Sequence, residues 1–297
     1  MDRFVSPKRV AQALGVSESS LKRWCDKGML PTNRTAGGHR KLALADVLSF
    51  LRQQGKSLIH PELLGLPQRS QHTEDNWDAL LGQFSQAIQN GDSTAIQQII
   101  YDLYLGGHSI AKICDHLICA AMREMGENWS CGSVEVYAER RACELISKHL
   151  HDLGLKIPLR TTGPVAMGGT LTGDYYQLPT QMVELVLQDQ GWQASSLGCN
   201  LPSGTLGTSM RDHQPRLFWL SISYFADREL FLQQYHKVAA TAAELQIPLA
   251  IGGQALTTKL RSELSYTVYC ENLQDLLNYS QSLIMPKSTL TASPAVP

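Results

Sequence analysis

A short basic hairpin lies in the first fifth of the chain, and its side chains are of the kind that bind phosphate. The stretch RTAGGHRKL, residues 34–42, sets one arginine before a Gly-Gly pair and three further cations or imidazoles after it. Because glycine adopts positive φ at no steric cost, the pair permits a tight turn that projects these side chains together. Such a cluster suits contacts to a nucleic-acid backbone, so we expect a phosphate-binding wing. Its four members are Arg34, His39, Arg40 and Lys41.

Two short helices are predicted immediately before this wing. Ser6 and Ser17 are suitable N-caps, and glycines at positions 15 and 28 follow the two segments. Periodicity turns Leu21 and Trp24 inward, which leaves the rest of the second helix facing solvent. The pair predicts a helix-turn-helix whose second helix enters a major groove. The side chains that this helix would present are Ser19, Ser20, Lys22 and Arg23.

Charge is concentrated in the same region. Residues 1–60 carry eleven Lys and Arg against four acids, although the whole chain has a net charge of −1. A single basic turn is usually a solvated surface hairpin, but here the helix-turn-helix, the wing and the local charge coincide. The sequence therefore predicts binding to double-stranded DNA.

Residues 6–51 resemble the MerR family of transcription regulators. The resemblance implies a winged helix-turn-helix, residues 1–56, that binds pseudo-palindromic promoter DNA as a homodimer or higher homo-oligomer. It also implies that ALADVLSFLRQQG, residues 43–55, forms a helix that supports the wing. Family members usually continue into a long dimerisation helix, whereas residues 57–74 are expected here to be a linker.

Composition limits the compartment and the number of domains. The length of 297 residues predicts two or three domains. The seven cysteines form no C-x-x-C pair, which favours a reducing compartment. The start of the chain has no signal-like apolar region, and no stretch approaches 18 uncharged apolar residues. We expect a cytoplasmic protein that does not span a membrane.

The remainder of the chain predicts a multidomain α and α/β fold. Residues 75–157 show helical periodicity with glycine-containing breaks, which predicts a four-helix bundle. Residues 163–285 alternate short apolar strands with helices, the pattern of a doubly wound parallel sheet. Candidate strands are residues 164–169, 192–198, 216–223 and 248–253. The tail, residues 286–297, has the Pro, Ser and Thr content of disorder.

A bundle followed by such a sheet resembles the cobalamin-binding module of methionine synthase and of light-responsive MerR-type repressors of carotenoid genes. The module carries D-x-H-x-x-G, S-x-L and G-G motifs. This chain has DYYQLP at 174–179, then 41 residues, SIS at 221–223, then 28 residues, and Gly252-Gly253. The W-x9-E-H motif of the repressors falls on Trp129, Glu139 and Arg140. If a corrinoid binds, the resemblance implies that it contacts Trp129, Glu139, Tyr176, Ser221, Gly252 and Gly253.

The motif departs from the family where the chemistry is most demanding. The histidine that ligates cobalt from below falls on Tyr176, and the glycine after it falls on Pro179. A neutral phenol with a pKa near about 10 is a poor substitute for an imidazole nitrogen. On the upper side, Ser130 and Arg140 stand where the family has histidine. Trp129 and Glu139 also fit a simpler role as bundle core and surface acid, and Gly252-Gly253 fits a plain tight turn.

The sequence therefore predicts a non-enzymatic, sequence-specific DNA-binding regulator with a degenerate cobalamin-type module. No cofactor and no metal is predicted, and the signal is expected to come from a partner protein or another ligand. A functional adenosylcobalamin-dependent, light-responsive repressor is the alternative. A corrinoid carrier or methyltransferase component is a further one. Cys114, His116 and Cys119 could suggest a metal, but buried thiols and a surface histidine explain them as well.

Overall fold

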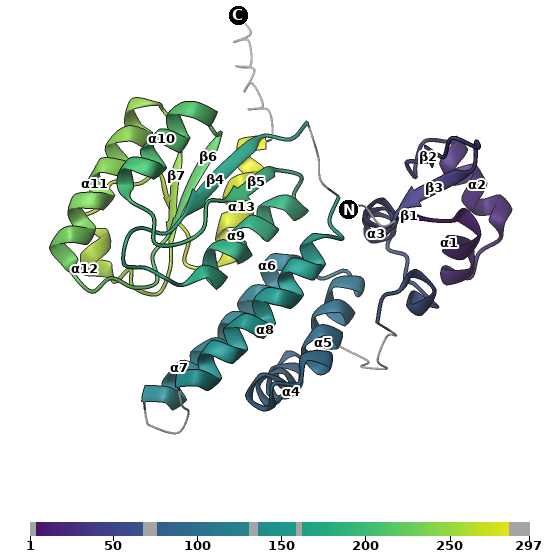
Figure 1. The fold of residues 1–297 in the computed structure, drawn as a ribbon, viewed down its shortest axis with the longest axis horizontal. Coiled ribbons are helices and arrows are strands. Elements are labelled where there is room, and N and C mark those ends of the chain that lie inside the picture. Colours follow the sequence, from purple (N-terminus) through teal and green to yellow (C-terminus); the bar gives the residue numbers. More distant parts are fainter. Residues whose placement is uncertain (1–3, 68–75, 131–135, 159–161, 285–297) are drawn as a thin grey trace, which may run out of the picture.

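The computed structural model describes residues 4–67, 76–130, 136–158 and 162–284, and it divides into a winged domain, a helical bundle and an α/β domain (Figure 1). The expected fold class is confirmed, because the described residues contain the winged helix-turn-helix, the bundle and a parallel sheet. No helix among these residues is long and apolar enough to cross a membrane.

The winged domain folds from the local signals in its sequence. The helices α1 (Pro7–Ala13) and α2 (Glu18–Asp26) begin at Ser6 and Ser17, whose side chains accept the backbone N–H of Arg9 and Ser20. A small antiparallel sheet has the order β1 (Phe4–Val5), β3 (Arg40–Ala43), β2 (Asn33–Arg34). Helix α3 (Leu44–Gln53) follows β3 and closes the core, which confirms the expected supporting helix.

Part of the expected linker is folded onto this domain. The short 3-10 helix η1 (Pro61–Leu64) lies against α1, and the backbone N–H groups of Ile59 and His60 both donate to Ala13 O. Leu58, Leu64 and Leu66 are buried there. The expectation of a linker over 57–74 is therefore wrong for its first ten residues, because their leucines complete the winged domain's core. Residues 68–74 lie outside the described ranges.

Four helical rods form the bundle, as the sequence predicts. They are α4 (Trp77–Asn90), α5 (Ser93–Leu105), a continuous rod of α6 (Ile110–Ile113), η2 (Cys114–Cys119) and α7 (Ala120–Ser130), and α8 (Val136–Gly154). The η2 segment is a π-helix, which widens the turn in the middle of the third rod. Its Asp115 carboxylate accepts the N–H groups of Leu273 and Gln274 at the start of α13 (Leu273–Ile284), so the bundle caps a helix of the α/β domain.

The α/β domain is a five-stranded parallel sheet in the order β5-β4-β6-β7-β8. The strands are β4 (Val165–Gly169), β5 (Gln193–Ser196), β6 (Leu217–Ser221), β7 (Leu249–Gly252) and β8 (Val268–Tyr269). Strand β5 pairs with one edge of β4, and the next strand in sequence, β6, pairs with the opposite edge of β4. The topological switch point therefore lies between β4 and β6, where open α/β sheets bind ligands at their carboxyl ends.

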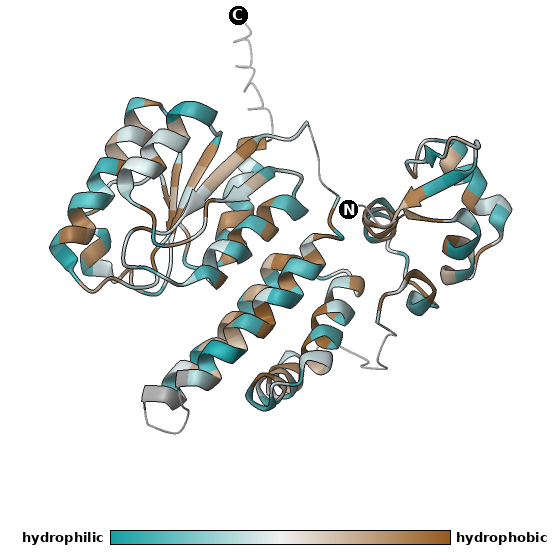
Figure 2. Ribbon diagram, in the orientation of Figure 1, coloured by the Kyte–Doolittle hydropathy of each residue, from teal (hydrophilic) through white to brown (hydrophobic). Residues whose placement is uncertain are grey.

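Helices cover both faces of the sheet (Figure 1). Helix α9 (Gln177–Asp189) and α13 pack on one face, while α10 (Ser203–His213), α11 (Arg228–Glu244) and the short α12 (Thr258–Arg261) pack on the other. Figure 2 shows the central strands as largely hydrophobic and α2 as largely hydrophilic. One apolar cluster runs from the winged domain through the bundle to the α9 face of the sheet.

Candidate functional site

The second helix of the helix-turn-helix presents a polar, cationic face. Ser19, Lys22 and Arg23 are exposed on α2, whereas Leu21 is fully buried. Ser20 differs from the expected pattern, because it is half-buried and its Oγ lies 3.0 Å from the Oγ of the capping Ser17. Ser20 therefore belongs to the cap of α2 as much as to its outer face.

An aromatic contact holds α2 in position. The ring of Trp24 lies 5.2 Å from that of Phe50 on α3, and the ammonium group of Lys56 lies 5.5 Å from the Trp24 ring. Trp24 is half-buried, as its helical position predicts. Rigid packing of α2 on α3 fixes the direction in which Lys22 and Arg23 point.

The wing is the hairpin of β2 and β3. Thr35 N donates to His39 O over 2.9 Å, and Gly38 takes a φ of 78° at the turn. Arg34 and His39 are exposed, and Lys41 is half-buried. The predicted turn thus forms, and the hairpin lies beside α2 (Figure 1).

An ion pair joins the wing to α2. Arg40 Nη2 lies 2.6 Å from an oxygen of Asp26, the last residue of α2. Arg34 and Arg40 face each other across the hairpin, an arrangement in which like charges repel. Asp26 offsets that repulsion and sets the orientation of Arg40. Sequence reasoning named Arg40 but missed Asp26, because the two are fourteen positions apart.

A buried carboxylate closes the switch point of the α/β domain. Asp174 follows β4 and is 2 % exposed. Its oxygens accept the backbone N–H of Ser223 at 2.7 Å, of Tyr224 at 3.2 Å and of Tyr176 at 3.0 Å. Burial raises the pKa of Asp174, and these backbone donors act against the shift. Asp174 thereby ties the loop after β4 to the end of β6, a role that sequence reasoning missed.

Tyr176 lies between this edge and the bundle. It occupies the N-cap position of α9 with a half-buried ring. Burial is the main cause that raises the pKa of its phenol, and the nearby Glu139 carboxylate on α8 adds to the shift. Tyr176 and Glu139 therefore interact electrostatically, although no hydrogen bond joins them among the described residues. The side chain of Trp129 lies outside the described residues.

Pro179 is part of a helix rather than a loop. It is the third residue of α9, where a backbone N–H has no partner within the helix. Proline therefore costs no hydrogen bond at this position. Helix α9 begins two residues before it, at Gln177.

The remaining motif residues serve the sheet. Ser221 is buried at the end of β6 and pairs in register with Gly252 on β7. Gly253 has a φ of 127°, and a Cβ there would lie 2.2 Å from Ile222 O. The plain structural reading of Gly252-Gly253 therefore accounts for the second glycine without any ligand.

A tryptophan fills the space between the sheet and α9. The indole N–H of Trp219 on β6 donates to Thr180 Oγ1 over 2.9 Å, and that oxygen lies 3.2 Å from Ser196 Oγ. A Cβ on Gly168 of β4 would lie 2.3 Å from the Trp219 ring, so the ring lies directly over this glycine. Both Trp219 and Thr180 are buried. This side of the sheet is thus packed by the protein's own side chains.

The cysteines of the bundle do not assemble a metal centre in the described part of the chain. No group of three or more His, Cys, Asp or Glu is placed there to hold a metal ion. Burial raises the pKa of Cys119 to about 12 and that of Cys114 well above its usual value. His116 is exposed, and its ring lies 5.5 Å from that of Trp77. These thiols pack as apolar groups.

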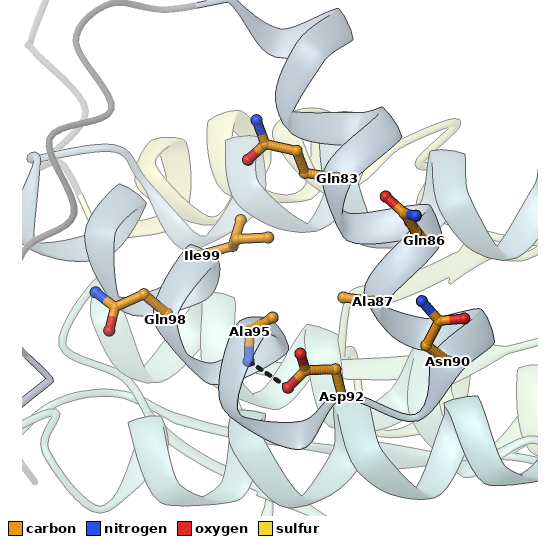
Figure 3. A pocket seen from close by; sticks show the side chains of 8 residues that line it. All are labelled: Gln83, Gln86, Ala87, Asn90, Asp92, Ala95, Gln98 and Ile99. Atoms are coloured by element: carbon orange, nitrogen blue, oxygen red, sulfur yellow. Dashed lines mark hydrogen bonds between the residues drawn. The ribbon is translucent and has the colours of Figure 1, made fainter.

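A hollow of about 300 Å³ lies between α4 and α5, apart from the predicted site residues (Figure 3). Amide side chains rim it, and Asp92 is engaged in capping α5 through the N–H of Ala95. Its lining consists of Gln83, Gln86, Ala87, Asn90, Asp92, Ala95, Gln98 and Ile99.

Comparisons with known proteins agree with this arrangement. Residues 4–55 match the helix-turn-helix domain model, and residues 80–151 match the B12 binding domain model. The chain is 20% identical over 284 residues to the HTH-type transcriptional repressor CarA of Myxococcus xanthus, which covers 91% of this chain and 94% of that protein. It is 18% identical over 204 residues to the trimethylamine corrinoid protein of Methanosarcina barkeri, covering 67% of this chain and 94% of the relative.

A solved structure shows the same fold. The monomethylamine corrinoid protein of Methanosarcina barkeri matches with a TM-score of 0.55 and 14% identity, over 70% of this chain and 99% of its own. The chain thus carries a helix-turn-helix domain at its N-terminus, followed by a module of the B12-binding type.

Proposed function

We propose that this chain is a MerR-type transcription regulator that binds double-stranded promoter DNA and acts in the cytoplasm without catalysing a reaction. The observation that carries the proposal is the adjacency of the exposed cations of α2 to the basic wing. In this proposal Lys22 and Arg23 contact the major groove or its phosphates. The phosphate backbone is contacted by the wing residues Arg34, His39, Arg40 and Lys41. Ser19 and Ser20 lie in the first turn of α2, which enters the major groove. Similarity to a transcriptional repressor supports a regulatory role.

Two copies act together on the promoter in this proposal. A single winged helix-turn-helix reads about one half-site, and two-fold symmetry doubles the contacts. The segment after the winged domain folds back on α1 as η1, so it supplies no long helix for dimerisation among the described residues. In this proposal the contacts between copies do not involve a long helix within residues 57–67.

The residues at the carboxyl edge do not fit cobalamin. A lower axial ligand must offer a lone pair at fixed geometry, which a phenol does well only after losing its proton. Burial and Glu139 raise the pKa of Tyr176 above its usual value, so the phenol holds its proton at neutral pH. The Trp219 ring, held by Thr180, also occupies the space between the sheet and α9.

The input signal in this proposal is a partner protein or a ligand other than cobalamin. The carboxyl edge remains the place for it, since α/β sheets of this topology bind ligands at the switch point. Tyr175 and Tyr224 flank Asp174 there, and both are exposed, at 62 % and 50 %. Exposed aromatic side chains are enriched where proteins bind partners.

Adenosylcobalamin added to the purified full-length protein in the dark, followed by illumination, tests this function. We expect no corrin absorption shift at micromolar cofactor and the same promoter affinity in darkness and light. Cofactor uptake with light-dependent release from DNA would instead establish a photoreceptor. Failure to bind any promoter fragment upstream of its own or neighbouring genes would contradict the regulator.

A further inference from the structure

Arg52 connects all three parts of the protein. It lies in the last turn of α3, in the winged domain, and its Nη1 is 2.6 Å from an oxygen of Asp189 at the end of α9. Its Nη2 lies 3.4 Å from the other oxygen of Asp189 and donates to His108 O over 3.2 Å. The guanidinium carbon lies 4.3 Å from the centre of the Tyr104 ring. One side chain thus touches the bundle and the α/β domain together.

The position of this cation follows from helix electrostatics. Three helices end around it, namely α3 at Gln53, α5 at Leu105 and α9 at Asp189. A helix carries partial negative charge at its C-terminus, so a cation there is stabilised. A carboxylate in the last turn is disfavoured for the same reason, and Asp189 sits in that position. The positive charge of Arg52 compensates the partial negative charge of the helix ends and the charge of the Asp189 carboxylate. The Arg52 and Asp189 side chains are shielded from solvent, at 20% and 9% exposed.

Helix α9 runs from the carboxyl edge to this contact. Its N-cap is Tyr176, beside Asp174, and its last residue is Asp189. Thirteen residues at 1.5 Å each span about 20 Å. The helix is held along α8, because Ser147 Oγ donates to Gln181 Oε1 over 2.6 Å and Gln181 Nε2 donates to Ser147 O over 3.0 Å. One continuous helix therefore joins the carboxyl edge to the Arg52 contact.

We propose that Arg52 is an interdomain latch that fixes the orientation of the DNA-reading face relative to the α/β module. In this proposal α9 relays structural changes from the carboxyl edge to Asp189 and so to Arg52. The effect on DNA binding rests on the proposed function, whereas the contact between Arg52 and Asp189 does not depend on it. Helix α3 faces the module and α2 faces away, so the latched domain keeps its groove-binding face open (Figure 1). In a dimer, a fixed orientation sets the separation between the two reading helices.

The proposal predicts a change in spacing preference rather than in half-site affinity. In Arg52→Gln and Asp189→Asn, the winged domain is released while Lys22, Arg23 and the wing are unchanged. We expect discrimination between the natural operator and operators with inserted base pairs to fall by about fivefold or more, a typical interdomain coupling. Affinity for an isolated half-site should stay within twofold. The double variant should lose no more than the Arg52 variant, because both substitutions break one contact.

Small-angle X-ray scattering of the full-length chain tests the latch independently of DNA. The radius of gyration should rise in Arg52→Gln and in Asp189→Asn, and it should stay unchanged in the control Gln53→Ala, an exposed neighbour on α3. Thermal melts establish that each variant is folded. Unchanged scattering in both folded variants overturns the latch. Altered scattering with an unchanged spacing preference overturns the role of Arg52 in setting the separation of the reading helices. Absence of DNA binding by the wild type counts against the proposed function alone.

Discussion

The guanidinium group of Arg40 on the wing lies 2.6 Å from the carboxylate of Asp26 at the end of α2. The two elements that would contact DNA are therefore joined directly. Both side chains remain partly exposed, at 27% and 49%, so the pair contributes little to stability and Arg40 can exchange Asp26 for a phosphate. The winged domain thus presents a basic surface whose geometry is set before DNA arrives.

Removing the wing cations should weaken DNA binding regardless of sequence. In Arg40→Ala/Lys41→Ala, each lost phosphate contact should reduce the salt dependence of binding by roughly one unit of slope. Fluorescence anisotropy across a salt series measures this. The matched control is Arg123→Ala/Lys148→Ala, which removes two exposed cations from the bundle. Equal slopes for wild type and the wing variant would exclude the wing as a phosphate-binding element.

The footprint on promoter DNA should show two-fold symmetry. Two half-sites about 34 Å apart, one turn of the DNA helix, are expected for a dimer of winged helix-turn-helix domains. Hydroxyl-radical footprinting combined with the mass of the complex checks both the spacing and the number of chains. One bound chain that protects one half-site would contradict a dimer on DNA.

The indole hydrogen bond of Trp219 should stabilise the α/β domain. Trp219→Phe removes the donor to Thr180 and should lower the free energy of unfolding by about 1 kcal/mol, while Trp219→Ala should cost about 3–5 kcal/mol through the cavity it leaves. Trp192→Phe is the matched control, because Trp192 is equally buried and its Nε1 has no hydrogen-bond partner in the described part of the chain. Urea denaturation measures all three. Equal losses for the two Phe variants would argue against the Trp219–Thr180 bond.

The buried histidine of the bundle should make stability fall in mild acid. His149 is 3% exposed, its Nε2 lies 2.9 Å from Ser93 Oγ, and its Nδ1 has no partner among the described residues. Burial lowers its pKa below the usual 6.5, with Asp152 opposing and Lys148 adding to the shift. The unfolded chain therefore binds the proton more readily, so stability is lost as pH falls below about 6.5.

Melting temperatures between pH 7.5 and 5 check this dependence. His149→Gln should flatten the decline, because the group that takes up the proton on unfolding is gone. His151→Gln, an exposed histidine on the same helix, should leave the slope as it is in the wild type. A wild-type melting temperature that rises toward pH 5 would contradict a lowered pKa for His149.

The sequence by itself determined the winged domain and the order of the layers. Ser6 and Ser17 cap their helices through N–H groups three residues away, and Gly38 makes its turn through its own φ. Such signals act within a few residues, so they can be read before the chain folds. The spacing between the later motifs also follows the strand ends, because Ser221 ends β6 and Gly252 ends β7, whereas Asp174 lies in the loop after β4.

Only the tertiary structure decided which side chains fill the switch point and join the domains. The run LFWL, residues 217–220, is apolar without interruption because β6 is buried on both faces, so no alternation reveals that Trp219 faces α9. Strand β8 has two residues, too few for any pattern. Arg52 and Asp189 are 137 positions apart, and nothing local to either predicts that they meet. Contacts of this kind depend on how the winged domain, the bundle and the α/β domain pack against one another, and that packing exists only once all three have folded.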